Sequence, residues 1–372
     1  MSRLIVRGAN IAWSGLSRGG HATYVLQWLH GLHRLGHEVL YHDVLDEQPS
    51  VVEAFRAVVA QWDLPIAIAG MARDGRTLVG LSVDELQLFA EHSALVLSLG
   101  ATYAHGVEPW LAHVHPRVLI DQDPGFTHLW SQTSEPAEIF GVHDAYFTIG
   151  ANVGTSRSPI PLSGLDWRHT WNPVVLDRWR PSAPPHGSIT TVASLWSQAY
   201  QEFDGQLWGP KAVQWEHFLD LPRLVGEPLE IAAERGAGEE MLRRLRSAGW
   251  SVVDATSAAG DIARYTDYIQ SSAAEFSCVK GLYVGTNSGW FSDRSACYLA
   301  AGHPVVMQDT GLHDVLPSGC GLHLVASVDQ AADAIRRIRT DYERESDAAR
   351  AIAAAHFDSD RVLQRLLAEV GV

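Results

Sequence analysis

Cysteine and positive charge are scarce in this chain of 372 residues. Lysine and arginine together number 28 against 43 aspartates and glutamates, which gives a formal charge of -15. Such a charge repels a phosphate backbone, so general nucleic-acid binding is not expected. The three cysteines, Cys278, Cys297 and Cys320, lack the close spacing of a zinc site or a disulfide framework. We therefore expect a reducing, cytoplasmic setting and no metal site.

Long apolar runs are absent as well. No stretch of about 20 apolar residues occurs, and the N-terminus lacks the basic start and apolar core of an export signal. We expect no integral membrane segment. With 46% hydrophobic and 19% charged residues, the chain is able to bury at least two ordinary cores, which excludes disorder and small disulfide scaffolds.

Lysine is rarer still, because only Lys211 and Lys280 occur among the 28 basic residues. The ratio indicates a coding bias toward arginine. Lysine remains at these two positions either because a compact point charge is required there or by chance at surface sites.

Short apolar segments alternate with helical patterns in the first half of the chain. We expect a strand at 4–6, a glycine-rich loop at 8–20, an amphipathic helix at 21–36 that ends at Gly36, and a second strand at 38–42. These elements in this order form a right-handed parallel unit, the beginning of a doubly wound sheet. Later apolar runs continue the alternation, with strands expected at 94–97, 117–120 and 145–149.

Proline-rich sequence near 155–187 indicates a domain boundary. Beyond it the alternation begins again. A helical C-terminal segment starts at about 331 and breaks near 356–358. The strands expected in this half are 189–192, 229–232, 251–253, 282–284 and 304–307. The prediction is an α/β protein with two Rossmann-like doubly wound domains.

One segment of the second half combines a loop with the start of a short helix. Ser292 is a plausible N-cap, so the amides of Asp293, Arg294 and Ser295 would point into the preceding loop. A helix N-terminus with an arginine suits a diphosphate. The alternative is an ordinary turn in which Asp293 stabilises the helix start and Arg294 forms a surface ion pair.

The run AAGHPVV at 300–306 and the run LGHEV at 35–39 are two motifs that resemble the nucleotide-sugar glycosyltransferases of the GT-B architecture. The run AAGHPVV at 300–306 is similar to their small-small-Gly-x-Pro-Val-Val segment. Gly19-Gly20, the following amphipathic helix and LGHEV at 35–39 are similar to their N-terminal acceptor domain. The two stretches lie one in each half, so the resemblance covers nearly the whole chain at the level of organisation.

The resemblance implies two Rossmann-like domains that face each other across a cleft. An acceptor domain would occupy 1–172, a linker 173–187 and a nucleotide-sugar domain 188–350, with a helix at 351–372 packing back on the first domain. It also implies transfer of a sugar from a nucleotide-diphosphate donor, such as a UDP-sugar, to an acceptor hydroxyl or similar nucleophile. The donor is a co-substrate, and no separate cofactor is expected.

One departure concerns a Glu-x7-Glu pattern that is usual in the large retaining family of this architecture. Counting back from Gly302 places Gly289 and Cys297 at these positions, and neither offers a carboxylate. Asp293 or Glu275 would then take over the contact with the ribose.

Cations near the same segment are candidates for the diphosphate. Lys280 precedes the expected strand at 282–284, and with Arg294 it would stabilise the departing nucleoside diphosphate. The resemblance implies that such cations act in place of a metal. Lys211 is a further candidate for the same role. The alternative for Lys280 is a helix C-terminal lysine that completes the dipole.

Two residues of the first half are candidates for acid–base chemistry. His21 lies where the first loop meets the first helix, which is where ligands approach doubly wound sheets, and it could take a proton from an acceptor hydroxyl. It is also one of 18 histidines, so a capping or surface role is the alternative. Asp123, in the sequence Asp121-Gln122-Asp123, could line the cleft or serve as another base, although two aspartates at a strand end are common.

Tryptophans gather around the expected boundary, where they either stack on a ligand or form core. The six are Trp167, Trp171, Trp179, Trp196, Trp208 and Trp215. Alternative functions are an epimerase or phosphorylase of the same architecture and a non-catalytic nucleotide-binding scaffold. A dinucleotide oxidoreductase is disfavoured because Gly15, Gly19 and Gly20 do not spell Gly-x-Gly-x-x-Gly.

Overall fold

The chain folds into two compact units in the computed structural model. The structure describes residues 2–12, 19–100, 108–180, 187–195, 200–234 and 238–372. Unit 1 comprises Met1–Gly154, Ile160–Val175 and Ser359–Val372, and unit 2 comprises Thr155–Pro159 and Leu176–Asp358. The chain therefore passes between the units several times, and one of these passages, after Val175, lies within the predicted linker at 173–187.

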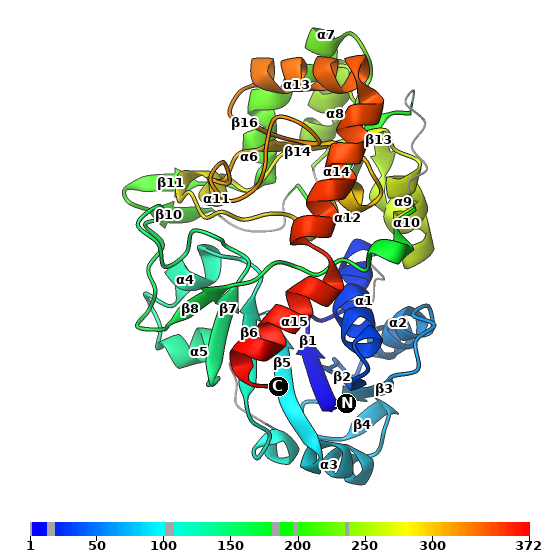
Figure 1. The fold of residues 1–372 in the computed structure, drawn as a ribbon, viewed down its shortest axis with the longest axis vertical. Coiled ribbons are helices and arrows are strands. Elements are labelled where there is room, and N and C mark those ends of the chain that lie inside the picture. The colour runs from blue at the N-terminus through cyan, green and yellow to red at the C-terminus, as the bar shows by residue number, and fades with distance from the viewer. Residues whose placement is uncertain (1, 13–18, 101–107, 181–186, 196–199, 235–237) are drawn as a thin grey trace. The chain divides into compact units, whose positions relative to one another are not determined.

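Unit 1 is built on a sheet with the strand order β4-β3-β2-β1-β5-β6-β7-β8, in which only the pairing of β4 with β3 is antiparallel (Figure 1). The strands are β1 Arg3–Gly8, β2 Glu38–Val44, β3 Ala67–Met71, β4 Thr77–Gly80, β5 Ser93–Leu99, β6 Arg117–Asp121, β7 Ala145–Thr148 and β8 Trp167–His169. The helices are α1 Gly19–Arg34, α2 Pro49–Val59, α3 Val83–Glu91, η3 Pro109–Leu111, α4 Phe126–Trp130, α5 Pro136–Phe140 and α15 Ser359–Val370. The strand order reverses between β1 and β5, as in a Rossmann-like fold.

Helix α1 follows the pattern expected from the sequence. Its buried residues include Val25, Trp28, Leu29 and Leu32, each fully covered. Burial of such side chains contributes about 1.5–3 kcal/mol each to folding. Gly36 has a φ of +86°, a left-handed conformation that suits glycine at the end of a helix. The prediction of this helix and of its stop is confirmed.

The last helix, α15, packs on α1 within unit 1 (Figure 1). The Ser359 amide donates to the Val174 carbonyl at 2.9 Å. The Val175 amide donates to Gln27 Oε1 on α1 at 2.7 Å. The close approach is made at Gly31, where an added Cβ would lie 2.5 Å from Leu363 Cδ1. Glycine at this position allows the two helix backbones to come together.

Unit 2 contains a parallel sheet with the order β13-β12-β9-β14-β15-β16, which is the 3-2-1-4-5-6 order of the Rossmann fold. Its strands are β9 Ile189–Ala193, β12 Glu230–Ala233, β13 Ser251–Asp254, β14 Ala274–Ser277, β15 Val305–Gln308 and β16 Leu322–Val325, and the hairpin strands β10 Gln201–Phe203 and β11 Gln206–Trp208 form a separate pair. Its helices are η4 Leu176–Arg178, α6 Lys211–Trp215, η5 Glu216–Phe218, α7 Leu221–Val225, α8 Glu239–Ser247, α9 Ala255–Ala259, α10 Ile262–Gln270, α11 Gly281–Gly285, α12 Asp293–Ala300, α13 Val328–Thr340 and α14 Tyr342–His356.

One predicted strand of unit 2 is wrong. Residues 282–284 belong to α11, and the strand of this region is β14, which ends at Ser277, before the expected strand would begin. All four residues of β14 are buried, so it is a central strand with no alternation of exposed positions. A short apolar run does not distinguish a buried strand from a buried helical turn, which explains the error. The predicted break near 356–358 is confirmed, because α14 ends at His356 and α15 begins at Ser359.

Several of the clustered tryptophans form core. Trp215 contacts Trp250 edge-to-face at a centroid distance of 4.7 Å, and both rings contact Phe276 of β14. Trp179 is also buried, whereas Trp196 lies outside the described residues. Among the described tryptophans of the six, Trp167, Trp179 and Trp215 are therefore core residues of the units to which they belong. In the described part of the chain, no helix combines the length and apolar character needed to cross a lipid bilayer.

We expect Gly31→Val to destabilise the protein by about 1–3 kcal/mol, because the new side chain overlaps Leu363. Urea unfolding measures the effect, and His33→Val on the same helix serves as the control. Combined with Leu363→Ala, the change should cost less than the sum of the two single changes. Strict additivity would contradict the contact between α1 and α15.

Candidate donor site in unit 2

The strand order of unit 2 reverses between β9 and β14, so the loops after these two strands leave the sheet at the same point. In Rossmann-like folds the crevice at such a point, beside the carboxyl ends of the strands, binds the ligand. Lys280 lies three residues after the end of β14 and is the N-cap residue of α11. Lys211 is the first residue of α6, the helix that follows β9 and its hairpin.

The two lysines of the chain meet here through a pair of aromatic rings. Lys211 Nζ lies 6.0 Å from the centre of the Trp290 ring, and Lys280 Nζ lies 5.3 Å from the centre of the Tyr283 ring. The two rings stack on each other at 4.7 Å. Lys280 Nζ also donates to Tyr283 Oη at 3.3 Å. Residues about 70 positions apart thus form one cationic cluster, which we call the lysine pair.

An amide side chain ties the two lysine-bearing segments together. Gln308, the last residue of β15, donates from Nε2 to Gln214 Oε1 of α6 at 2.8 Å. Its own Oε1 accepts from the Val279 amide at 3.3 Å and from Cys278 Sγ at 3.5 Å. One residue therefore fixes both the helix that carries Lys211 and the segment that leads to Lys280.

Trp208, at the end of the hairpin, packs on the glycine face of α11. A Cβ at Gly285 would lie 2.1 Å from Trp208 Cζ2, and a Cβ at Gly281 would lie 3.3 Å from Trp208 Cε3. The two glycines are four residues apart and so lie on one side of the helix. The indole occupies the space that their side chains would fill, and this contact docks the hairpin beside Lys280.

The environment of Lys211 disfavours the protonated form of its amine. Burial disfavours the ammonium, and the nearby charges of Arg294 and Lys280 repel it, so the pKa of Lys211 falls to about 7. Weaker contributions of opposite sign come from Cys278 and Asp293. The amine therefore titrates near neutral pH, unlike an ordinary lysine.

The predicted roles of Arg294 and Glu275 are corrected by the structure. Arg294 Nε donates to Glu275 Oε1 at 2.5 Å, Nη1 to the Val192 carbonyl at 2.7 Å and Nη2 to Ser277 Oγ at 2.8 Å. Glu275 is fully buried and lies on β14, not on a helix. The pair therefore joins α12 to two strands. Neither side chain is placed to bind a ligand as expected.

The start of α12 is also more enclosed than predicted. Ser292 is at the N-cap position with extended backbone, as expected, but its side chain makes no capping hydrogen bond. Ser292 and Ser295 are buried, whereas Asp293 is partly exposed. The expected exposed turn that grips a diphosphate with Arg294 is therefore wrong, and a ligand role stays a prediction for Asp293.

In unit 1, the loop after β1 has an unusual backbone. Gly8, Ala9 and Asn10 all have positive φ, at +93°, +80° and +50°. Asp43 of β2 supports the turn, because its Oδ2 accepts from the Ile11 amide at 3.2 Å and lies 3.0 Å from Tyr41 Oη. Tyr41 Oη in turn donates to the Gly8 carbonyl at 2.6 Å. These contacts hold the loop at the point where the sheet order reverses.

His21 lies in the first turn of α1, next to this loop, as the sequence predicts. Its side chain is exposed, and its Nε2 is hydrogen-bonded to the Ala9 carbonyl. Residues 13–18 of the expected glycine-rich loop lie outside the described residues. The position of His21 is thus confirmed, whereas its catalytic role stays a prediction.

The Asp-x-Asp sequence is divided between two roles. Asp121 is fully buried and accepts from Thr127 Oγ1 at 2.8 Å and from Thr148 Oγ1 at 2.9 Å. Burial raises the pKa of Asp121 to about 7. Asp123 is partly exposed at the start of α4, with its carbonyl accepting from the Phe126 amide at 3.1 Å. Asp121 therefore supports the loop, and Asp123 is the carboxylate that can meet a ligand.

A charged group of unit 1 was not expected from the sequence. Arg7 of β1 lies opposite His42 of β2, and both contact Glu108, with Arg7 Nη1 at 2.9 Å from Oε2 and His42 Nε2 at 3.1 Å from Oε1. Burial opposes ionisation of Glu108, but the His42 hydrogen bond and the charge of Arg7 outweigh it and lower the pKa of Glu108. This carboxylate is ionised and is a poor base. No local sequence pattern predicts a contact among three residues so far apart in the chain.

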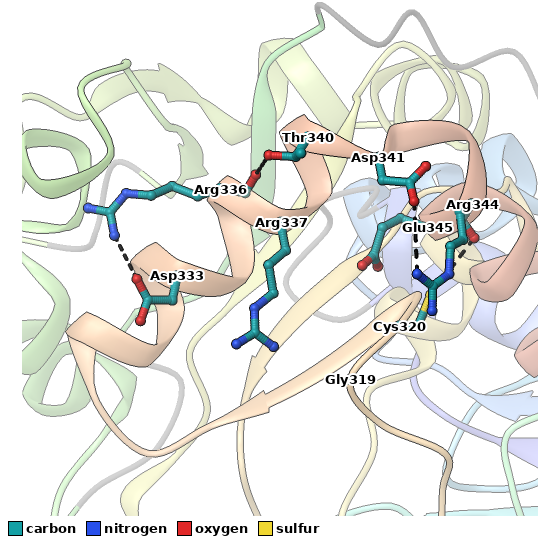
Figure 2. Close-up of a pocket in the computed structure, with 9 residues that line it drawn as sticks. All are labelled: Gly319, Cys320, Asp333, Arg336, Arg337, Thr340, Asp341, Arg344 and Glu345. Carbon is teal, nitrogen blue, oxygen red and sulfur yellow. Dashed lines mark hydrogen bonds and ion pairs between the residues drawn. The ribbon is translucent and has the colours of Figure 1, made fainter.

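A pocket of about 640 Å³ lies elsewhere in unit 2, between α13, the start of α14 and the residues before β16 (Figure 2). None of the predicted site residues lines it. Arg336 is paired with Asp333 at 2.7 Å, and Glu345 is paired with His323 at 2.8 Å. With several of its charges neutralised within the protein, this pocket is a weaker candidate than the lysine pair. Among the described residues, no group of three or more potential ligands is arranged to hold a metal ion.

We expect Arg294→Met to destabilise the protein by about 3–5 kcal/mol, because it leaves Glu275 buried without a partner. Urea unfolding measures the loss, with the exposed Arg243→Met as the control. The double change Glu275→Leu/Arg294→Met should recover most of it, since both charges are removed together. A double variant as unstable as the single one would contradict this account.

No protein-family model matches the chain, and no curated protein sequence does. Solved structures, in contrast, are similar over the full length. The Anabaena protein HepE in complex with UDP has a TM-score of 0.59 and 13% identity, with 100% of both chains covered. An alpha-glucosyltransferase in complex with UDP-glucose and DNA containing an abasic site has a TM-score of 0.61 and 10% identity, again with 100% of both chains covered.

A glycosyltransferase from Rickettsia africae has a TM-score of 0.56 and 10% identity, with 99% of this chain and 97% of that chain covered. At these identities the similarity concerns the fold. The strand orders of both units agree with it, since each is a Rossmann-like sheet. The chain has the GT-B fold, as the resemblance in its sequence implied.

Proposed function

We propose that this protein is a glycosyltransferase that moves a sugar from a nucleotide-diphosphate donor to an acceptor hydroxyl or similar nucleophile. The observation that carries the proposal is the lysine pair. The chain has 28 basic residues, and its only two lysines come together at the carboxyl edge of the unit 2 sheet, where the strand order reverses. The GT-B fold, shared with solved structures that contain UDP or UDP-glucose, supports the same choice.

In this proposal the lysine pair binds the diphosphate of the donor. When the bond between the anomeric carbon and the phosphate oxygen breaks, the electron pair stays on that oxygen, and the departing nucleoside diphosphate gains negative charge. Lys280 and the protonated form of Lys211 stabilise this charge. The two side chains would act here in place of a metal ion, so metal independence is part of the proposal.

Unit 1 would take the acceptor. His21 is exposed beside the strained loop after β1, and it would accept the proton of the acceptor hydroxyl as the oxygen attacks the anomeric carbon. Asp123, which follows β6, offers a carboxylate as a second candidate base. Folds of this kind host several chemistries, so the function is argued from these side chains and not from the fold alone.

A thermal-shift screen with UDP, GDP, dTDP, ADP and CMP sugars tests donor binding, because a ligand of the native state raises apparent stability. We expect one nucleotide to stabilise the protein. We also expect Lys280→Met to weaken its binding by about 10- to 100-fold, the effect of losing a charge-assisted contact. Arg246→Met, which removes an exposed charge of α8, is the control.

Binding of none of these nucleotides would contradict the proposed function, and equal losses in the two variants would contradict the role of Lys280. Product analysis with the bound donor, with and without acceptors, then separates sugar transfer from epimerisation and from binding without turnover.

We expect His21→Ala to lower kcat by about 10²- to 10⁴-fold, the range of general acid–base catalysis, while the affinity for the donor is kept. Steady-state kinetics and calorimetry with the donor measure the two effects separately. His33→Ala, on the same helix, is the control. An unchanged kcat in His21→Ala would show that His21 is not the base, and Asp123→Asn would then be the next variant to test.

A further inference from the structure

The lysine pair places two amines where only one positive charge is well accommodated. The groups that act on Lys211 come from three surrounding segments: Arg294 and Asp293 on α12, Lys280 at the start of α11, and Cys278 after β14. Two of the four are cations. Arg294 is already matched by Glu275 at 2.5 Å, so Glu275 has little attraction left for a second cation.

The groups of opposite sign do not compensate Lys211. Burial raises the pKa of the Cys278 thiol, so this residue stays neutral at physiological pH and carries no negative charge. Asp293 acts on Lys211 more weakly than either cation. Trp290 covers the Lys211 amine on another side, and an indole face attracts an ammonium but does not neutralise it.

We propose that Lys211 is the proton-accepting residue of the donor site, and that binding of a nucleoside diphosphate to unit 2 is coupled to the uptake of one proton by the Lys211 amine. The inference rests on the proposed function. In the empty site above neutral pH the amine is mostly neutral, and in the occupied site it is an ammonium. The proton comes from solvent to Nζ, and no other bond is made or broken.

The physical cause is a change in the charge that Lys211 faces. In the empty site the repulsion from Lys280 and Arg294, together with burial, favours the neutral amine and gives the pKa of about 7. A diphosphate brings negative charges next to the same nitrogen. These charges offset the repulsion from the other cations and raise the pKa of Lys211 toward that of an ordinary lysine.

The sign of the pH dependence follows by linkage. The bound state holds more protons than the free state at every pH between the two pKa values of Lys211, so affinity must fall as pH rises through that window. Kd therefore rises by up to about tenfold for each pH unit above 7. A ligand without phosphate charge would not raise the pKa, so its binding would show no such dependence.

An arginine at the same position distinguishes charge from titration. Arginine stays protonated throughout this pH range, so Lys211→Arg keeps the cation and removes the proton uptake. Lys211→Met removes both. We therefore expect the three proteins to differ in donor binding. Binding depends on pH in the native protein, is independent of pH in Lys211→Arg, and is weak and independent of pH in Lys211→Met.

The direct experiment uses the scarcity of lysine. In the protein of this sequence grown with ¹³C-lysine, the side chains give two lysine Cε resonances, because the chain contains two lysines. The loss of one resonance in Lys211→Arg assigns them. We expect the Lys211 resonance to titrate with a midpoint near 7 and to shift upward by more than one pH unit when UDP-glucose is bound. A midpoint near the ordinary value of about 10.4 in the free protein would overturn the inference.

Calorimetry provides the second measurement. UDP-glucose is titrated at pH 8 in two buffers with different ionisation enthalpies, since its phosphates carry no ionisable proton near this pH. We expect an uptake of close to one proton in the native protein and close to none in Lys211→Arg. Tight binding without uptake would overturn the inference and leave the proposed function standing. If neither UDP-glucose nor the other nucleotide sugars bind, both fall together.

Discussion

The contact on which the site of unit 2 depends is the packing of Trp208 against the two glycines of α11. Gly281 and Gly285 leave one side of the helix bare, and the indole fills it so closely that a methyl group at Gly285 would overlap the ring. This contact fixes the hairpin after β9 to the segment after β14. Gln308 adds a second link, because its side chain bonds both to Gln214 of α6 and to Cys278 after β14. These restraints also oppose the repulsion that arises whenever both lysines are protonated.

The alternation of strands and helices could be predicted from the sequence, because it follows from apolar periodicity alone. The helix at 19–34, its stop at Gly36 and the break after His356 are examples. The error at 282–284 has a physical cause: β14 is buried on both faces, yet its sequence AEFS contains the charged Glu275 and therefore gives no apolar run. Only the partner on α12 makes a carboxylate acceptable there, and that partner lies 19 residues away.

The site could be predicted in part. Both lysines were identified by their scarcity and by the position of Lys280, although the residues that follow Lys280 were predicted as a strand and form helix α11. Their contact through Tyr283 and Trp290 could not be foreseen, since it depends on the path of the hairpin and on the glycine face of α11. The i, i+4 spacing of Gly281 and Gly285 was the available signal. The role of Arg294 was mistaken for a different reason. A helix N-terminus with an arginine has the same sequence pattern whether the guanidinium faces solvent or a buried glutamate.

The division of labour between arginine and lysine follows from the chemistry of the two side chains. Arginine serves where this protein needs a fixed cation with several donors: Arg294 spans α12 and two strands, Arg339 binds both oxygens of Glu227 at 2.9 Å, and Arg350 donates to the Trp179 carbonyl at 2.8 Å. In each of these contacts loss of a proton would break the structure, and arginine does not lose one. At position 211, in contrast, a lysine allows the charge to disappear. In an empty site the neutral amine of Lys211 relieves the repulsion from Lys280 and Arg294, which allows the site to stay assembled before its anionic ligand arrives.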